Sequence, residues 1–188
     1  MRVIGGTARG RRLAAFTGSN IRPTPDRVRE ALFSILYSRM GSLEGLRVLD
    51  IFAGSGALGI EALSRGAAAA WFIDSAEQAR RTIVENLERC RFTARARILQ
   101  ADVLKALQGL PGEMSFDLIF LDPPYGREWP EQILALIDAR GLLARKGLVC
   151  LEAGAGDKVP LHAGGLSCFE QRRYGSTMLH FFHRDANE

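Results

Sequence analysis

The sequence predicts an α/β protein with a Rossmann-like, seven-stranded and mostly parallel sheet, in which one strand runs antiparallel. From residue 46 onward, short apolar runs alternate with segments of helical periodicity, a pattern typical of parallel strands joined by helices. A glycine-rich loop follows the first apolar run, where a strand of such a sheet turns into a helix. Ahead of this core, a basic stretch with interspersed apolar residues predicts an N-terminal β-hairpin followed by a helix.

The predicted N-terminal helix is marked at both ends by residues that favour helix boundaries. Thr24 is suited to cap it, Pro25 to occupy its first position, and Gly41 to end it. Apolar residues recur between them at helical spacing, so one face of this helix should dock on the main sheet.

The other predicted elements follow with short connections. We expect strands near 47–52, 69–74, 96–101, 116–121, 147–152, 167–173 and 177–183, and helices near 57–65, 76–90, 103–109 and 129–140. Only Arg173 to Ser176 separate the last two strands. This connection is too short for a crossover helix, so the two strands should form an antiparallel hairpin at one edge of the sheet.

Length and composition favour one globular domain over residues 1–188, with a basic extension and helix at 1–41 and a catalytic core at 42–188. No apolar run approaches a membrane span and the N-terminus lacks a secretory signal, so we expect a cytoplasmic protein without a membrane partner. The three cysteines form no CxxC pair, and His180 and His183 should lie on opposite sheet faces. We therefore expect no metal site.

The positive charge is concentrated at one end of the chain. Residues 1–40 contain eight arginines against two acids, which is net +6 in a chain of net charge +4, so the remainder is net negative. The planar guanidinium suits bidentate phosphate contact, which favours nucleic acid as the partner. A solvated basic tail is the alternative, but Val3, Ile4 and Leu13 favour a folded hairpin. The RNA-contacting arginines expected here are Arg9, Arg11, Arg12, Arg22, Arg27 and Arg29.

The glycine loop predicts a cofactor site at the carboxyl end of the first strand. Asp50 closes that strand, and Gly54, Gly56 and Gly59 allow a tight turn, a close approach to a ligand and packing of the next helix. The spacing also matches a dinucleotide site. However, an acid just before the loop would repel a pyrophosphate and suits the cationic sulfonium of S-adenosylmethionine.

Two further acids end the next predicted strands. Asp74 is placed to accept hydrogen bonds from the ribose hydroxyls of a nucleoside cofactor, although dinucleotide enzymes place an acid similarly. Asp102 could receive the adenine amine, with the amide of Val103 beside it, or it could simply cap a helix. The predicted cofactor-binding residues are Asp50, Phe52, Ala53, Gly54, Gly56, Asp74, Asp102 and Val103.

The catalytic residues are predicted in the corner Asp122, Pro123, Pro124 and Tyr125, directly after the apolar run 116–121. The lone pair of an exocyclic amine is delocalised into its ring, so an enzyme must orient it toward the methyl group. The Asp122 carboxylate and the Pro123 carbonyl could each accept one N–H, and the prolines would fix that carbonyl. Tyr125 would stack on the target base. A Pro-Pro turn with a capping Asp is the alternative.

Four segments together resemble one known family. Residues Ile4–Arg12, Arg22–Phe33, Asp50–Gly66 and Leu121–Tyr125 look like the RsmD family of bacterial methyltransferases that modify 16S rRNA, and the second segment is the most specific. This resemblance implies a class I S-adenosylmethionine-dependent methyltransferase acting on N2 of guanine 966, preferably in the assembled small ribosomal subunit. It implies 16S rRNA as the partner and leaves contacts with neighbouring ribosomal proteins open.

Two other functions fit parts of the pattern. Adenine-N6 DNA methyltransferases also use an acidic Pro-Pro-aromatic corner, but they usually carry an added recognition domain, for which 188 residues leave no room. A non-catalytic RNA-binding ribosome assembly factor would need neither the acidic corner nor the glycine loop.

Overall fold

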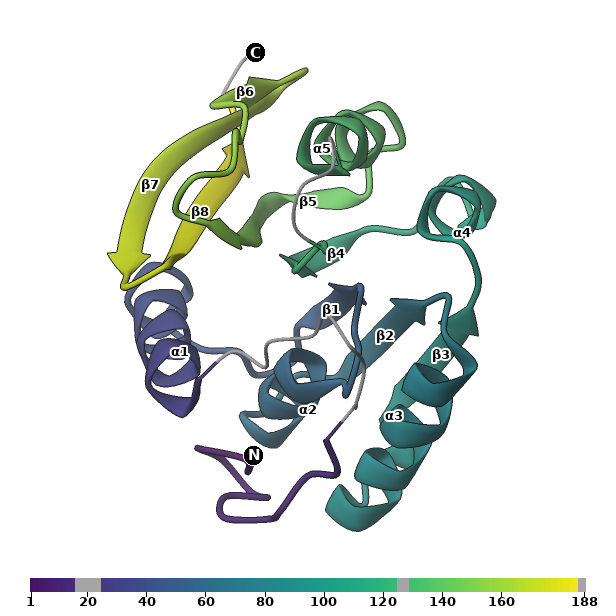
Figure 1. The fold of residues 1–188 in the computed structure, drawn as a ribbon. Helices are drawn as coiled ribbons and strands as arrows, with labels where there is room; N and C mark the ends of the chain where they lie inside the picture. The colour runs from purple at the N-terminus through teal and green to yellow at the C-terminus, as the bar shows by residue number, and fades with distance from the viewer. Residues whose placement is uncertain (16–24, 125–128, 186–188) are drawn as a thin grey trace.

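A computed structural model describes residues 1–15, 25–124 and 129–185. It contains one eight-stranded sheet with helices on both faces (Figure 1). The strands are β1 (Arg47–Ile51), β2 (Ala69–Asp74), β3 (Ala96–Gln100), β4 (Phe116–Leu121), β5 (Leu143–Gly154), β6 (His162–Ala163), β7 (Leu166–Tyr174) and β8 (Thr177–Arg184). The helices are α1 (Asp26–Met40), α2 (Ala57–Ser64), α3 (Glu77–Cys90), α4 (Val103–Gly109) and α5 (Trp129–Ala139), with a short 3₁₀ turn at Thr93–Arg95.

The sheet has the order β3-β2-β1-β4-β5-β8-β7-β6, and its first five strands are parallel. The chain moves outward from β1 to β2 and β3, and then returns to the other side of β1 for β4. Strand order therefore reverses between β1 and β4. In open sheets of this kind, ligands bind beyond the carboxyl ends of the strands at this point.

The predicted α/β fold is confirmed, with two differences at the C-terminal side. All seven predicted strands are present, and among them β8 alone runs opposite to its neighbour β5. The last two strands do form an antiparallel hairpin, but β8 inserts between β5 and β7 instead of lying at the edge. The two-residue β6 pairs with β7 and takes the edge position. Such a short strand carries no apolar alternation, so no sequence pattern marked it.

Two apolar clusters occupy the two faces of the sheet. One joins alternate strand residues, such as Val48, Leu118 and Phe120, to α1, α2, α3 and the N-terminal segment. The other joins the intervening strand residues, such as Leu49 and Ile119, to α4 and α5. Figure 1 shows the same division of the helices between the two sides of the sheet. Buried parallel strands of this kind read as nearly continuous apolar runs because both faces are covered.

Helix α1 confirms the predicted N-terminal helix. It begins at Asp26, and Pro25, predicted at the first helical position, lies one residue earlier at the N-cap. The predicted cap Thr24 lies outside the described residues. It ends at Met40, and the next residue, Gly41, has a φ of 75° and donates its N–H to the Tyr37 carbonyl at 2.9 Å. Phe33 on this helix packs against Phe120 of β4, with ring centroids 5.8 Å apart. Of the helices within the described residues, none has the length and apolar content needed to span a membrane.

Residues 1–13 form a folded turn that we call the N-terminal hairpin. An antiparallel bridge joins Arg2 to Arg12, and backbone hydrogen bonds link Val3 to Gly10 and to the Arg11 carbonyl. The predicted hairpin is thus present, although it is too short and irregular to form two regular strands. Val3, Ala8 and Leu13 are buried in the cluster shared with α1 and α2, which sets this segment apart from a solvated tail.

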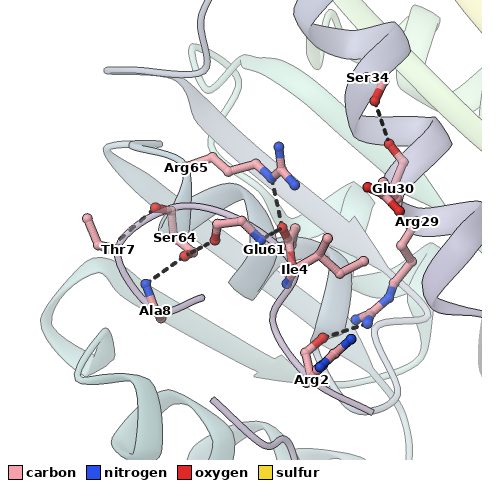
Figure 2. A network of polar contacts seen from close by, with 11 residues as sticks. Arg2, Ile4, Thr7, Ala8, Arg29, Glu30, Ser34, Glu61, Ser64 and Arg65 are labelled. Carbon is pink, nitrogen blue, oxygen red and sulfur yellow. Dashed lines mark hydrogen bonds and ion pairs between the residues drawn. The ribbon is translucent and has the colours of Figure 1, made fainter. Parts of the chain in front are cut away.

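The last turn of α2 holds the N-terminal hairpin through two polar side chains (Figure 2). The fully buried Glu61 carboxylate accepts the N–H groups of Ile4 at 2.8 Å and Gly5 at 2.7 Å, and the guanidinium of Arg65 at 2.7 Å. Ser64 accepts the Ala8 N–H through its hydroxyl, which donates in turn to the Gly5 carbonyl at 2.6 Å. These contacts satisfy backbone groups that the short hairpin cannot pair internally.

We expect Gly6→Ala to lower the free energy of unfolding by about 1–3 kcal/mol, because it overpacks this contact. Gly6 has a φ of 75°, and a Cβ placed on it would lie 1.8 Å from the Ser64 carbonyl oxygen. Gly10→Ala is the matched control: Gly10 also has a positive φ, of 83°, but a Cβ placed on it would meet nothing within 4 Å. Urea unfolding should show the larger loss of stability for Gly6→Ala. Equal losses would mean that only backbone strain matters.

Candidate active site

The glycine loop between β1 and α2 is closed by the side chain of Asp50. This buried carboxylate accepts the Gly59 N–H at 2.9 Å, so it ties the end of β1 to the first turn of α2. A Cβ at Gly59 would lie 2.4 Å from the ring of Phe72 in β2. Gly56 precedes α2 in the left-handed conformation, with a φ of 74°. The predicted packing role of Gly59 therefore agrees with the geometry, and Gly56 takes a turn conformation that favours glycine, while its close approach to a ligand stays a prediction.

Asp74, at the carboxyl end of β2, holds the loop from the neighbouring strand. One of its carboxylate oxygens accepts the Gly54 N–H and the other accepts the Ala76 N–H, each at 2.9 Å. Ala53 donates its N–H to the Ile73 carbonyl at 3.0 Å, which adds a second tie between loop and strand. A carboxylate has about four acceptor sites, so these bonds leave acceptor capacity for a ligand hydroxyl.

Asp102 caps α4 in this structure. Its Oδ1 accepts the Lys105 N–H at 3.1 Å, and it lies exposed beyond the carboxyl end of β3, while Val103 is buried behind it. The alternative that Asp102 caps a helix is therefore confirmed. Binding of an adenine amine by the same residue stays a prediction.

Asp122 follows β4 directly, at the point where strand order reverses. Its N–H lies 3.4 Å from the Ile51 carbonyl, so the first residue of the corner continues the pairing of β4 with β1. Asp122 is half-buried, Pro123 is buried and Pro124 is exposed. Tyr125, predicted to stack on a base, lies outside the described residues.

Phe52, directly after β1, has an unusual backbone conformation. Its φ is 60°, which few residues other than glycine adopt. Its ring meets that of Trp129, at the start of α5, edge-on at 5.5 Å. This contact connects the loop after β1 with the helix that follows the corner.

Three acids meet on one sheet face at the switch point. Asp50 and Glu152 lie near the carboxyl ends of β1 and β5, and Asp122 directly follows β4. Each of these acids follows, by two residues, a residue whose side chain lies on the sheet face covered by α1 and α2. These residues are Val48, Phe120 and Cys150. Side chains two apart on a strand share a face. Of the residues that the structure describes, no group of three acids, histidines or cysteines has the arrangement of a metal site.

Burial and neighbouring negative charges raise the pKa values of two of these acids, Asp50 and Asp122. Burial raises the pKa of Asp50 to about 7, with a smaller contribution from Asp74 and an opposing one from the Gly59 N–H. Burial also raises the pKa of Asp122 well above its usual value, with further contributions from the negative charges of Glu152 and Asp50. A site that disfavours several negative charges favours a positively charged ligand, because a cation beside them restores their ionised forms.

Glu152 is the residue of this group that the sequence analysis missed. It is buried near the end of β5, and its strand neighbour Leu151 pairs with Leu121 of β4, so Glu152 lies beside Asp122. An acid that closes the apolar run 148–151 was the available signal, the same signal that marked Asp50 and Asp74.

The raised pKa of Asp50 predicts a pH-dependent stability. Between pH 3.8, its ordinary pKa, and about 7, the folded protein retains a proton that the unfolded chain has released. The free energy of unfolding should therefore fall as pH rises through this range. Urea unfolding at pH 5 and pH 8 should show a smaller loss for Asp50→Asn than for the unmodified protein. Parallel losses in the two proteins would show that Asp50 titrates normally.

The predicted RNA-contacting arginines occupy three different environments. Arg9, Arg12 and Arg27 are exposed. Arg11 is exposed too, but its guanidinium donates to the Arg89 carbonyl in the last turn of α3. Arg22 lies outside the described residues.

Arg29 is a correction to the predicted set. Its side chain is fully buried, and it donates to the Arg2 carbonyl at 2.6 Å and to Asp26 at 2.8 Å. Figure 2 shows it pointing from α1 toward the N-terminal hairpin. Arg29 therefore joins the helix to the hairpin and is not available to a phosphate. Helical spacing places Arg29 on the buried face of α1, beside Val28 and Leu32. The prediction relied on its positive charge instead.

Known proteins resemble this chain over nearly its whole length. The family model described as conserved hypothetical protein 95 matches residues 1–183. A Bacillus subtilis protein, provisionally named rRNA methyltransferase YlbH, is 38% identical over 178 residues, covering 94% of this chain and 95% of its own. Ribosomal RNA small subunit methyltransferase D of Escherichia coli K12 is 33% identical over 188 residues, covering 99% and 91%. The solved structure of Escherichia coli yhhF, provisionally assigned as a methyltransferase, is 32% identical with a TM-score of 0.85, covering 100% and 99%.

Proposed function

Because this chain belongs to the family of ribosomal RNA small subunit methyltransferase D, we propose that it transfers a methyl group from S-adenosylmethionine to N2 of a guanine in 16S rRNA. The observation that carries the proposal is the position of Asp122 and its two prolines at the switch point between β1 and β4. We further propose guanine 966 as the target, and the assembled small subunit as the preferred substrate.

The residues around the glycine loop suit this cofactor. The Asp74 carboxylate, fixed by the amides of Gly54 and Ala76, would accept the ribose hydroxyls, while Asp102 and Val103 would meet the adenine. Asp50, Phe52, Ala53, Gly54 and Gly56 would line the remainder of the site. When bound, the cofactor supplies an electrophilic methyl group on a positively charged sulfur. The acids at this edge suit that charge, whereas they would repel a pyrophosphate.

At the corner, the protein's contribution would be orientation of the amine. The Asp122 carboxylate and the Pro123 carbonyl would each accept one N–H from N2, which turns the nitrogen lone pair toward the methyl group. Pro123 is buried, its ring fixes its φ, and the following Pro124 restricts its ψ to extended values, so the direction of its carbonyl is constrained. Formation of the N2–methyl bond would break the sulfur–methyl bond, whose electron pair would stay on the sulfur as a neutral thioether. The nitrogen would then release one proton, which the nearby carboxylate of Asp122 would accept. Tyr125 would stack on the base.

The exposed arginines of the N-terminal hairpin would contact the RNA backbone. We expect replacement of Arg9 and Arg12 with alanine to weaken binding to 16S rRNA and to reduce its salt dependence by about 0.7 in log–log slope for each phosphate that is no longer bound. Binding of S-adenosylmethionine should be unchanged. Filter binding over a salt series measures this. Arg11 is left in place because its contact with Arg89 joins the hairpin to α3. Loss of cofactor binding as well would show that the two arginines are structural.

The apolar cluster shared by the N-terminal hairpin, α1 and the sheet supports one methyltransferase domain over residues 1–188. We place the protein in the cytoplasm with its ribosomal substrate, and ribosomal proteins near the target are potential contacts.

The direct test is transfer of labelled methyl from S-adenosylmethionine to four substrates: unmodified small subunits, naked 16S rRNA, duplex DNA and protein extract. Label at guanine N2 in subunit RNA supports the proposal, and comparison with naked RNA shows whether assembly is needed. Label in DNA would favour the adenine-N6 methyltransferase. No label despite cofactor binding would favour a non-catalytic assembly factor.

A further inference from the structure

The turn between β7 and β8 lies at the same edge of the sheet as Asp122. Strand β5 runs past the end of β4, and its last residues Glu152, Ala153 and Gly154 pair with Leu179, Met178 and Thr177 at the start of β8. The Ala155 N–H also donates to the Ser176 carbonyl, at 2.9 Å. The hairpin of β7 and β8 therefore carries its turn beyond the carboxyl ends of the parallel strands.

Strand register places Arg172 in a row with the acids of the candidate site. Glu152 of β5 pairs with Leu179 of β8, and Leu179 pairs with Arg172 of β7. Paired residues on neighbouring strands point to the same face, and Leu179 belongs to the cluster on the face of α1 and α2. Two strand spacings put the Arg172 backbone about 10 Å from that of Glu152. Asp122 is one strand further along the same row.

The side chains at this end of the hairpin are exposed and mainly basic. Arg172 and Arg173 are both exposed. Glu170, which is itself largely buried, binds Arg172 at 2.7 Å and Arg39 of α1 at 2.6 Å, so one negative charge is shared between two arginines. Figure 1 shows the turn lying beside α1. Arg39 and Arg172, with the single acid Glu170, give this surface a net positive charge. Arg173 projects from the opposite face of β7 and donates to the Gly175 carbonyl of the turn at 3.0 Å.

The N-terminal hairpin is seated away from this edge of the molecule. It is held by the last turn of α2 through Glu61 and Ser64. Helix α2 has eight residues and begins at the glycine loop, so Glu61 and Ser64 lie about 6 and 10 Å along the helix axis from its first residue. A phosphate next to a base at Asp122 would lie near a row of acids, which supplies it with no positive charge. Arg172, which lies in the same row, would supply that charge.

We propose that Arg172 and Arg173 on the β7–β8 hairpin bind the RNA backbone next to the target base. This proposal rests on the proposed function and extends it with a second RNA contact, on the opposite side of the catalytic corner from β1. The planar guanidinium fork suits a phosphate, and Arg39 can keep Glu170 paired when Arg172 moves to the RNA. The contact would position the flanking backbone while the corner binds the base.

The test compares Arg172→Ala/Arg173→Ala with Arg145→Ala/Lys146→Ala. The control pair is also exposed and removes the same charge, but it lies near the start of β5, at the opposite end of that strand from Glu152. Binding to naked 16S rRNA is measured over a salt series, together with cofactor binding, urea unfolding and steady-state methyl transfer. We expect the first variant to bind RNA about 10-fold more weakly near 0.1 M salt, with a salt slope smaller by about 0.7 for each phosphate that is no longer bound. KM for RNA should rise while kcat, cofactor binding and stability stay close to wild type.

Three results would overturn the proposal. One is unchanged affinity and slope for naked RNA, and another is an equal loss of affinity in the control variant, which would reflect net charge alone. The third is weaker binding to small subunits but not to naked RNA, which would assign the hairpin to a ribosomal protein. Absence of methyl transfer by the unmodified protein would refute the proposed function. A selective loss of RNA affinity in the Arg172→Ala/Arg173→Ala variant would still support this contact in that case.

Discussion

Replacement of Asp122 with alanine should lower the rate of methyl transfer on the order of 10²–10³-fold, the range typical for loss of one hydrogen-bonding group at a reacting centre. The Asp122 carboxylate lies at the end of β4 and is the side-chain acceptor that would orient the target amine. Cofactor binding should change little, because Asp74 and the loop amides are held by other contacts. Single-turnover transfer of labelled methyl measures the chemical step, and calorimetry measures binding of S-adenosylmethionine.

Asp122→Asn is the matched control for this variant. The asparagine oxygen can still accept an N–H, so the rate should stay within about 10-fold of wild type if orientation dominates. A drop in rate for Asp122→Asn as large as for Asp122→Ala would mean that the negative charge, or proton acceptance, is essential. A rate for Asp122→Ala close to wild type would refute the proposed mechanism.

Glu61→Ala should have the largest effect on stability, about 3–5 kcal/mol in the free energy of unfolding, as expected when one partner of a buried ion pair is removed. Glu61 is fully buried in α2, and it accepts the amides of Ile4 and Gly5 and the guanidinium of Arg65. Its removal would leave these three donors without their acceptor. Arg65 also stacks on Phe33 at 4.8 Å and on Tyr37 at 5.6 Å, so contacts with α1 would loosen too.

The control for this prediction is Glu85→Ala, which removes an i,i+4 ion pair with Arg89 on the exposed face of α3. Exposed pairs contribute about 0–1 kcal/mol, so this variant should remain near wild type. Urea unfolding measures both, and limited proteolysis should cut the N-terminal hairpin first in Glu61→Ala. A change below about 1 kcal/mol would show that the hairpin contributes little to the fold.

The sequence predicted the sheet well because periodicity reports burial directly. Strands β1, β2 and β4 lie within one residue of their predicted limits, since each is buried on both faces and ends at an acid or a glycine loop. The limits of β5 and the presence of β6 were missed for a different reason. At its start β5 carries exposed Arg145 and Lys146, which break the apolar run. They lie between Leu143 and Leu148, the residues that pair with β4 on either side of a shift in register, so no local pattern marks them as part of a strand.

Residues of the candidate site could be predicted from the sequence where their role depends on the local backbone alone. Gly56 and Gly59 follow from turn geometry and close packing, and Asp74 from its position at a strand end. Arg29 and Glu152 each carried a local signal, the helical spacing of Arg29 and the position of Glu152 after an apolar run, but their partners lie far away in the chain. Arg29 binds Arg2 and Glu152 lies beside Asp122, and no spacing within a single element reveals either contact.

The seating of the N-terminal hairpin on α2 limits how this protein can evolve. Because Glu61, Ser64 and Arg65 belong to the helix that follows the glycine loop, the basic extension is not an interchangeable module. A chimera that places residues 1–15 on another methyltransferase core would also have to carry over these three side chains, which hold the N-terminal hairpin in place. The extension and the core should therefore have been inherited together, and recombination between them should be rare.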